Sequence, residues 1–203
     1  MNTIGKNSFT LMELIIVIAI LAAISVPNAF RAIEKAKVAR AISETRTIKT
    51  AALDYYSDTG NWSPAYGLTS AVNPFLTDPG VNGWDGPDVE KWNPHPWGGN
   101  VGWEIDIDLD DDGINDGNVL LDDDRPGTSY SDNQRRIPLH SMIKIDETID
   151  DGNLTTGYVQ GDGRGLYAAS GELVIMVIHD GAPLDVVFLT NIPLNSSTFY
   201  CIL

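Results

Sequence analysis

Apolar residues dominate the chain from Phe9 to Val26, and a different pattern follows Pro27. In the second part, apolar positions recur every three or four residues with Arg and Lys between them, as in an amphipathic helix: Phe30, Ile33, Ala41, Ile42, Thr45, Ile48, Ala52, and Tyr55 or Tyr56. A proline inside a helix removes one backbone hydrogen bond and kinks it without ending it. The pattern therefore predicts one bent helix over residues 9–57, ended by the turn residues 58–61.

Beyond this helix, short apolar segments alternate with Gly, Asn, Asp and Pro. Such segments predict strands, at Val101–Ile107, Leu139–Ile145, Glu172–His179, Val186–Thr190 and Phe199–Leu203. Residues 60–100 are rich in Gly, Pro, Asn and Trp, which indicates irregular loops pinned by packed tryptophans. The predicted fold class is α+β: a long N-terminal helix, half membrane-like and half amphipathic, followed by a loop-rich antiparallel β domain over residues 58–203.

Charge is distributed very unevenly along the 203 residues, whose formal net charge is −15. Residues 31–49 carry six basic and two acidic side chains, whereas residues 50–203 carry six basic and 25 acidic ones. Nucleic acid is not an expected partner of so acidic a domain, because phosphate binding requires a cationic surface. Divalent cations are, because clustered carboxylates are hard oxygen ligands. The single cysteine, Cys201, excludes a disulfide within the chain.

Glu13 is the one charged residue in the apolar run. A charged side chain in the middle of a membrane helix costs about 2.5–3.5 kcal/mol on insertion scales. A secretory signal peptide would have an uninterrupted apolar region, and Pro27 lies just past the small residues where a peptidase would cut. A plain membrane anchor needs about 20 residues, and the run supplies 18, from Phe9 to Val26. Neither interpretation explains the glutamate.

The stretch Ser8-Phe9-Thr10-Leu11-Met12-Glu13-Leu14 resembles the processing site of the type IV pilin superfamily, which includes the pseudopilins of type II secretion. The resemblance implies that a prepilin peptidase removes the leader 1–8 by cutting between Ser8 and Phe9, and that the new amino group of Phe9 is methylated. It also implies that residues 9–26 form the membrane segment and later the filament core. The family usually has Gly in place of Ser8, and its helix proline usually lies three residues later than Pro27.

The same resemblance implies a role for Glu13 in assembly. An unpaired carboxylate and an unpaired ammonium are both costly among packed apolar helices. If Glu13 of one subunit pairs with the Phe9 amine of its neighbour, both charges are neutralised and the axial register is fixed.

A second resemblance lies in the middle of the chain. The segments 51–60, 83–87 and 92–99 look like the corresponding regions of the major pseudopilin of type II secretion, with GWDGP and WNPHPWGG as its most specific parts. The resemblance covers residues 8–105. It implies a homopolymeric pseudopilus subunit whose partners are minor pseudopilins and an inner-membrane assembly platform. It also implies a single-pass protein of the bacterial inner membrane with a periplasmic domain.

An acidic loop at residues 106–124 contains the pattern D-x-D-x-D-G-x-x-D of calcium-binding loops. Its expected ligands are the carboxylates of Asp108, Asp110, Asp112 and Asp116 and the carbonyl of Ile114. The twelfth position, usually Glu, is Val119, so that one of three later carboxylates would close the shell: Asp122, Asp123 or Asp124. We expect calcium as the cofactor, and a solvated acidic loop without metal is the alternative.

The sequence does not predict an enzyme. His95, His140 and His179 lie far apart and lack the spacing of metal ligands, and no G-x-S-x-G motif is present. The expected function is a structural subunit of a type II secretion-like pseudopilus. Two alternatives are a type IV pilus pilin for adhesion or motility and a membrane-anchored, calcium-dependent binding domain that never polymerises.

Overall fold

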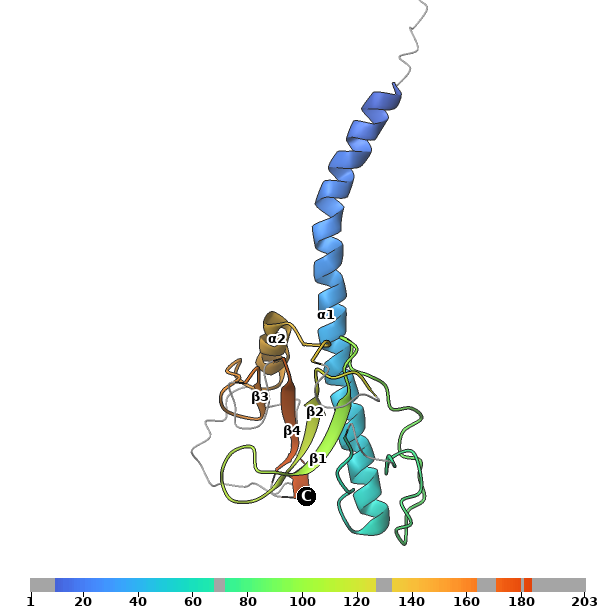
Figure 1. Ribbon diagram of the computed structural model, residues 1–203, viewed down its shortest axis with the longest axis vertical. Helices are drawn as coiled ribbons and strands as arrows, with labels where there is room; N and C mark the ends of the chain where they lie inside the picture. Colours follow the sequence, from blue (N-terminus) through green and yellow to red (C-terminus); the bar gives the residue numbers. More distant parts are fainter. Residues whose placement is uncertain (1–9, 68–71, 127–132, 164–170, 180, 184–203) are drawn as a thin grey trace, which may run out of the picture. The chain divides into compact units, whose positions relative to one another are not determined.

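The computed structural model describes residues 10–67, 72–126, 133–163, 171–179 and 181–183 (Figure 1). Ser8, Phe9, Cys201 and the predicted strands at 186–190 and 199–203 lie outside these residues. The chain divides into two units, residues 1–37 and residues 38–203.

The long helix predicted from the apolar pattern is confirmed as α1 (Leu11–Thr59), which continues through Pro27. Within the first unit its apolar side chains are exposed, including two that the amphipathic pattern assigned to a packed face: Phe30 is 67% exposed and Ile33 is 53% exposed. The buried face begins only in the second unit, and its members follow the expected helical spacing: Val38, Ala41, Ile42, Thr45, Ile48, Ala51, Ala52 and Tyr55.

The second unit contains one antiparallel sheet. Its strands are β1 (Val101–Ile107), β2 (Asp116–Leu121), β3 (Val159–Gly161), β4 (Leu173–His179) and β5 (Ala182–Pro183). The strand order is β1-β2-β4-β3, and β5 pairs with β4 (Figure 1). The predicted strands at 101–107 and 172–179 are confirmed as β1 and β4, and with them the α+β fold class.

The predicted strand at 139–145 is wrong, because this segment begins the helix α2 (Leu139–Ile149). The buried residues of α2 recur every three or four positions: Ser141, Met142, Ile145, Asp146 and Ile149. A window of seven residues was too short to distinguish this helical period from the alternation of a strand. Pro138, whose fixed φ suits the start of a helix, precedes its first turn.

Aromatic side chains fill the core of the second unit. Phe75 is fully buried, with its ring stacked on Trp92 at 5.5 Å and in edge contact with Trp103 at 5.8 Å and Tyr55 at 6.3 Å. The indole nitrogens also hold the loops, because Trp92 Nε1 donates to the carbonyl of Val101 at 2.9 Å. The expected packing role of these tryptophans is therefore confirmed.

Candidate functional site

Glu13 takes part in a local hydrogen-bond arrangement at the start of α1. Its Oε2 accepts hydrogen bonds from the backbone N–H and the hydroxyl of Thr10, both at 2.8 Å. In return, the Glu13 N–H donates to Thr10 Oγ1 at 3.3 Å. This is a capping box, in which a threonine and a glutamate three residues later satisfy N–H groups at the helix start. The capping box gives Glu13 a role within one chain that the sequence pattern T-x-x-E could have predicted.

The first part of α1 has the character of a membrane segment. Among the described residues, α1 is long and apolar enough to cross a membrane, and the side chains of its apolar stretch are exposed on this chain. Leu11, Ile18 and Ile24, for example, are 76%, 56% and 64% exposed. Such a surface requires a lipid or protein partner. The residues predicted to be cleaved and methylated, Ser8 and Phe9, precede the described part of the helix.

The acidic loop forms the hairpin connection between β1 and β2, which pair antiparallel with Ile107 opposite Asp116. Asp108 holds the turn, because its two oxygens accept hydrogen bonds from the N–H groups of Asp112, at 3.1 Å, and Gly113, at 2.8 Å. Gly113 has φ of +93°, a value that L-residues rarely adopt. The glycine of the D-x-D-x-D-G-x-x-D pattern therefore lies at a sharp turn of the chain.

The hairpin brings several of the predicted ligands together. One oxygen each from Asp108, Asp110 and Asp116 lies within 4.8 Å of the others. A second group at the same distance joins Asp110 and Asp112 to His179. Asp116 is buried and its Oδ2 accepts from the N–H of Leu109 at 2.9 Å, whereas Asp110 and Asp112 are exposed. The group of Asp108, Asp110 and Asp116 is thus a set of hard oxygen donors with one buried, one half-buried and one exposed member, which suits a cation that keeps some water.

His179 was not predicted as part of this site. Its Nε2 lies 2.9 Å from Asp110 Oδ2, although 69 residues separate the two in sequence. The pairing of β2 with β4 causes this contact, because Gly117 faces Ile178 and the end of β4 therefore lies beside the hairpin loop. Only knowledge of the strand register could have placed the histidine here.

Buried polar side chains fix the base of the loop. Gln160 on β3 donates from Nε2 to the carbonyl of Leu109 at 2.7 Å, and Asn118 on β2 donates to the carbonyl of Ile107 at 3.1 Å. Leu109 itself is fully buried in a small cluster with Val174. These hydrogen bonds and the burial of Leu109 therefore hold the base of the hairpin that carries the acidic carboxylates.

The three carboxylates expected to close the loop site lie elsewhere. Asp116 is the first residue of β2, and Asp122 comes directly after its last residue. Because six residues of strand span about 20 Å, the two carboxylates lie at opposite ends of the strand. Asp123 Oδ2 instead accepts from Arg136 Nε at 3.2 Å, and Asp124 Oδ1 accepts from the N–H of Asn133 at 2.7 Å. Asp122 and Asp123 form a separate acidic group with Glu172. They are therefore unavailable to the loop at the opposite end of the hairpin.

His95 lies near the C-terminal end of β2, where it has a structural role. It is buried, and its Nε2 lies 2.8 Å from the carbonyl oxygen of Asp122. Burial lowers the pKa of His95 to about 4, which keeps the imidazole neutral. A neutral ring that donates to a carbonyl ties the loop before β1 to the end of β2.

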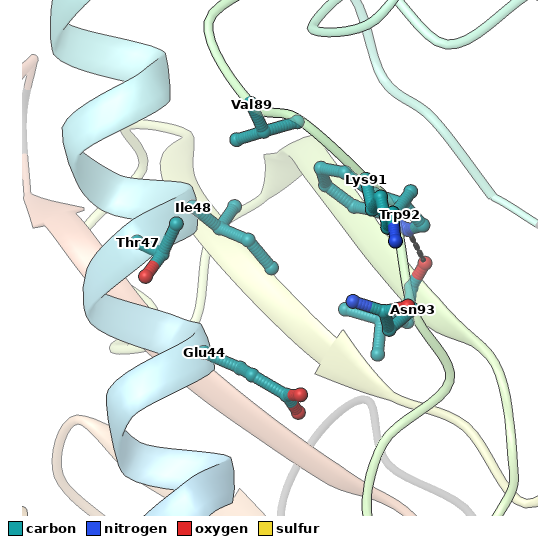
Figure 2. A pocket seen from close by; sticks show the side chains of 8 residues that line it. Glu44, Thr47, Ile48, Val89, Lys91, Trp92 and Asn93 are labelled. Atoms are coloured by element: carbon teal, nitrogen blue, oxygen red, sulfur yellow. Dashed lines mark hydrogen bonds between the residues drawn. The ribbon is translucent and has the colours of Figure 1, made fainter.

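A small cavity lies between α1, the loop 89–93 and β1 (Figure 2). Its volume is about 180 Å³, below the roughly 300–1,000 Å³ of typical small-molecule sites. Glu44 and Lys91 are its only titratable lining groups, and burial raises the pKa of Glu44. The one hydroxyl among its lining residues, that of Thr47, donates to the carbonyl of Ser43 at 3.0 Å within the helix.

An apolar helix with exposed side chains and a domain packed on the second half of the same helix are consistent with a pilin-like protein. Residues 32–115 match the family model described as "PilW, C-terminal". The match extends from the middle of α1 to the residue before β2 and covers less than half of the 203 residues. No significant match was found among curated proteins or among solved structures.

The family match is to a family related to type IV pilus biogenesis. Together with the long apolar helix, it supports a membrane-associated, type IV pilin-like component with a structural role. The match is not to the major pseudopilin of type II secretion, which the motifs around Trp84 and Trp92 resemble.

Proposed function

We propose that this chain is a structural subunit of a type IV pilin-like filament, polymerised through the first part of α1. One observation carries the proposal: a single helix has two different surfaces. From Val38 onward one face of the helix, with most of its apolar side chains, is buried against its own domain, whereas from Leu11 to Ile33 the large apolar side chains are exposed. An amphipathic helix uses its apolar stripe for one domain, but a helix that is apolar all round requires an external apolar environment.

Two environments satisfy this requirement in turn. The bilayer holds the helix of the stored subunit, and neighbouring helices replace the lipid when subunits assemble. If the helix passes through water, burial of the exposed apolar surface stabilises the assembly by about 25 cal/mol per Å². If the helix passes directly from lipid, close packing between helices provides the stabilisation instead. Assembly of this kind requires no reaction by the subunit itself, and we propose no catalytic role.

Maturation follows from the same proposal. A prepilin peptidase cuts between Ser8 and Phe9, the Phe9 amine is methylated, and Glu13 pairs with that amine on a neighbouring subunit. The domain 38–203 faces the periplasm or the cell exterior, with the helix in the bacterial inner membrane before assembly. If the filament is a type II secretion-like pseudopilus, its proposed partners are minor pseudopilins and an inner-membrane assembly platform.

Two kinds of filament are supported by different observations. The segments 83–87 and 92–99 support a type II secretion-like pseudopilus, through their resemblance to its major subunit. The family match over 32–115 supports a type IV pilus. A non-polymerising anchored binding domain is the third candidate, for which the acidic loop is the supporting feature.

We further propose that calcium stiffens the exposed domain at the acidic loop. Asp108, Asp110 and Asp116 are the central ligands, and Asp112 and the carbonyl of Ile114 complete the oxygen shell together with water. The support is the grouping of three carboxylates on a hairpin whose base is fixed by Gln160. Calcium accepts such irregular shells of oxygen ligands more readily than magnesium does.

Mass spectrometry of the mature N-terminus is the decisive experiment. A chain that begins with methylated Phe9 supports the filament proposal, whereas a chain that retains Met1 leaves only an anchor. Electron microscopy of sheared cells then distinguishes a long surface pilus from a short periplasmic pseudopilus. If overproduced mature subunits form no filaments in either place, polymerisation is excluded.

A further inference from the structure

A second acidic group, separate from the hairpin loop, lies where α2 ends and the chain turns toward β3. Asp146 lies in the last turn of α2, and Asp150 and Asp151 follow the helix directly. One carboxylate oxygen of each lies within 4.8 Å of the others. Acidic residues gather on many surfaces without binding anything, so the group needs an independent indication of a ligand.

Asp146 provides that indication. Its side chain is fully buried, with 0% exposure. Neither of its carboxylate oxygens has a hydrogen-bond partner among the described residues. The N–H groups of Asp151 and Gly152 favour its charged form, but neither reaches hydrogen-bonding geometry. Buried polar groups in native proteins nearly always have a partner, because an unsatisfied one costs about 1–3 kcal/mol and more when charged.

The electrostatic surroundings make the case stronger. Asp150 and Asp151 are both negative, and each raises the pKa of Asp146, in addition to the larger effect of burial; the result is a pKa of about 7. A positive ion at the point where the three carboxylates converge would counteract both effects, because it stabilises the ionised form of Asp146. Asp146 would then be ionised and satisfied at neutral pH.

The turn after α2 holds the other two carboxylates in place. Asp150 Oδ2 accepts from the N–H of Tyr158 at 2.7 Å, and Asp151 Oδ1 accepts from the N–H of Asn153 at 2.7 Å. Gly157 is required for this arrangement, because a Cβ at this position would collide with Asp150 Oδ2, and its φ is +85°. Each carboxylate retains a second oxygen, so the turn positions ligands without consuming them.

We propose that Asp146, Asp150 and Asp151 bind a divalent cation of the calcium type. The donor set is oxygen only, which excludes a preference for softer metals. The site lies in an irregular turn with Asp151 exposed, where water can complete the shell. Calcium tolerates such a shell, whereas magnesium demands near-octahedral geometry. The bound ion would link the end of α2 to the segment that leads into β3. This role does not depend on whether the chain forms filaments.

Isothermal titration calorimetry with CaCl2 on the full chain in detergent micelles, after removal of metal with EDTA, tests the site. We expect Asp146→Asn to lose one calcium per chain relative to the unmodified protein. Glu147→Gln is the matched control, because it removes one negative charge from the next residue of the same helix, on the exposed face where Glu147 pairs with Lys144 at 2.7 Å. This control should retain full stoichiometry.

The same measurement in an Asp110→Asn background separates this site from the hairpin loop. There we expect calcium binding to persist, and to lose one ion per chain when Asp146→Asn is added. Should Asp146→Asn fail to fold by circular dichroism, the exposed Asp151→Asn replaces it, with an expected loss of more than about 10-fold in affinity. Unchanged stoichiometry and affinity in these variants would overturn the proposal and identify Asp146 as a protonated, metal-free carboxyl group.

Discussion

Thr10 and Glu13 exchange hydrogen bonds in both directions at the start of α1: Glu13 Oε2 accepts from the N–H and the hydroxyl of Thr10, and the Glu13 N–H donates back to Thr10 Oγ1. The glutamate thus has a partner within its own chain as well as the proposed partner on a neighbouring subunit. A filament role and a capping role for this carboxylate predict different effects when Glu13 or its partner Thr10 is replaced.

Replacing Glu13 by Ala should abolish or strongly reduce filament formation, because the Phe9 ammonium of the adjoining subunit would then be buried without a counter-charge. Filament yield can be measured by shearing and quantitative immunoblotting, and order by electron microscopy. Thr10→Ala is the matched control, since it removes the cap but keeps the carboxylate. Equal losses in the two variants would assign Glu13 to helix capping alone.

The hairpin loop gives a second prediction. Asp110 belongs to both carboxylate groups of the loop, whereas the adjacent Asp111 belongs to neither. In a truncated protein that lacks residues 1–33, calcium should raise the thermal midpoint, and Asp110→Asn should remove much of that rise. One kcal/mol corresponds to about 2–4 °C in a domain of this size. The readout is differential scanning fluorimetry with EDTA and with excess CaCl2.

Asp111→Asn is the control for this loop variant, because it changes the charge by the same amount one residue away. Asp111 has φ of +62°, a conformation that Asn tolerates as well as Asp, so the backbone should not change. A thermal midpoint that does not respond to EDTA in the unmodified truncated protein would remove calcium from the account of this domain. A response that survives Asp110→Asn alone would point to the turn after α2.

Elements with a clear, repeated hydrophobic pattern in the sequence were predictable, whereas contacts that depend on strand pairing were not. The helix α1 repeats its pattern over many turns, and the alternating β1 and the apolar β4 are bounded by turn residues. The segment 139–149 has only three helical turns, and its first seven residues suit either structure. The capping box at Thr10 was also readable, because its signature is local.

The composition of the acidic sites shows the same division. The loop ligands Asp108 and Asp110 come from one contiguous motif, so the motif brings them together. His179 and Glu172 join acidic groups only through the register of β4 against its neighbours. Asp146 lies on the buried face of a helix that the sequence pattern did not reveal, and the absence of a hydrogen-bond partner for its carboxylate is a property of packing. No single-sequence pattern encodes that absence.

The packed tryptophan Trp103 gives a prediction about stability. Its side chain is fully buried against Phe75, and its Nε1 donates to the carbonyl of Ser63 at 3.2 Å. Trp103→Ala should lower the free energy of unfolding by about 3–5 kcal/mol, a large part of the roughly 5–15 kcal/mol typical of a domain. Urea denaturation measures this change. Trp103→Phe should cost less, and an equally small effect of both substitutions would contradict the packing role.

Glu104 on β1 gives a prediction about pH. Burial, with a smaller contribution from Asp106, raises the pKa of Glu104 to about 7 from its ordinary value of 4.5. Between these two values the folded protein binds more protons than the unfolded chain, so the free energy of unfolding falls as pH rises through this window. Glu104→Gln should remove the Glu104 contribution to this fall, because an amide does not ionise, whereas the contribution of buried acids such as Asp146 remains in both proteins. The variant should therefore be more stable than the unmodified protein at pH 8 and similar to it near pH 4.5.

Urea denaturation in EDTA across pH 4.5–8 checks this prediction without interference from bound calcium. His95 acts in the opposite direction, since its lowered pKa makes the folded state lose stability as pH falls below 6.5, but it is present in both proteins and cancels in the comparison. The exposed Glu90→Gln is the control, because it removes one negative charge from the surface of the same domain. Parallel profiles for the unmodified protein and Glu104→Gln would mean that Glu104 stays ionised in the folded domain, with water or a cation beside it.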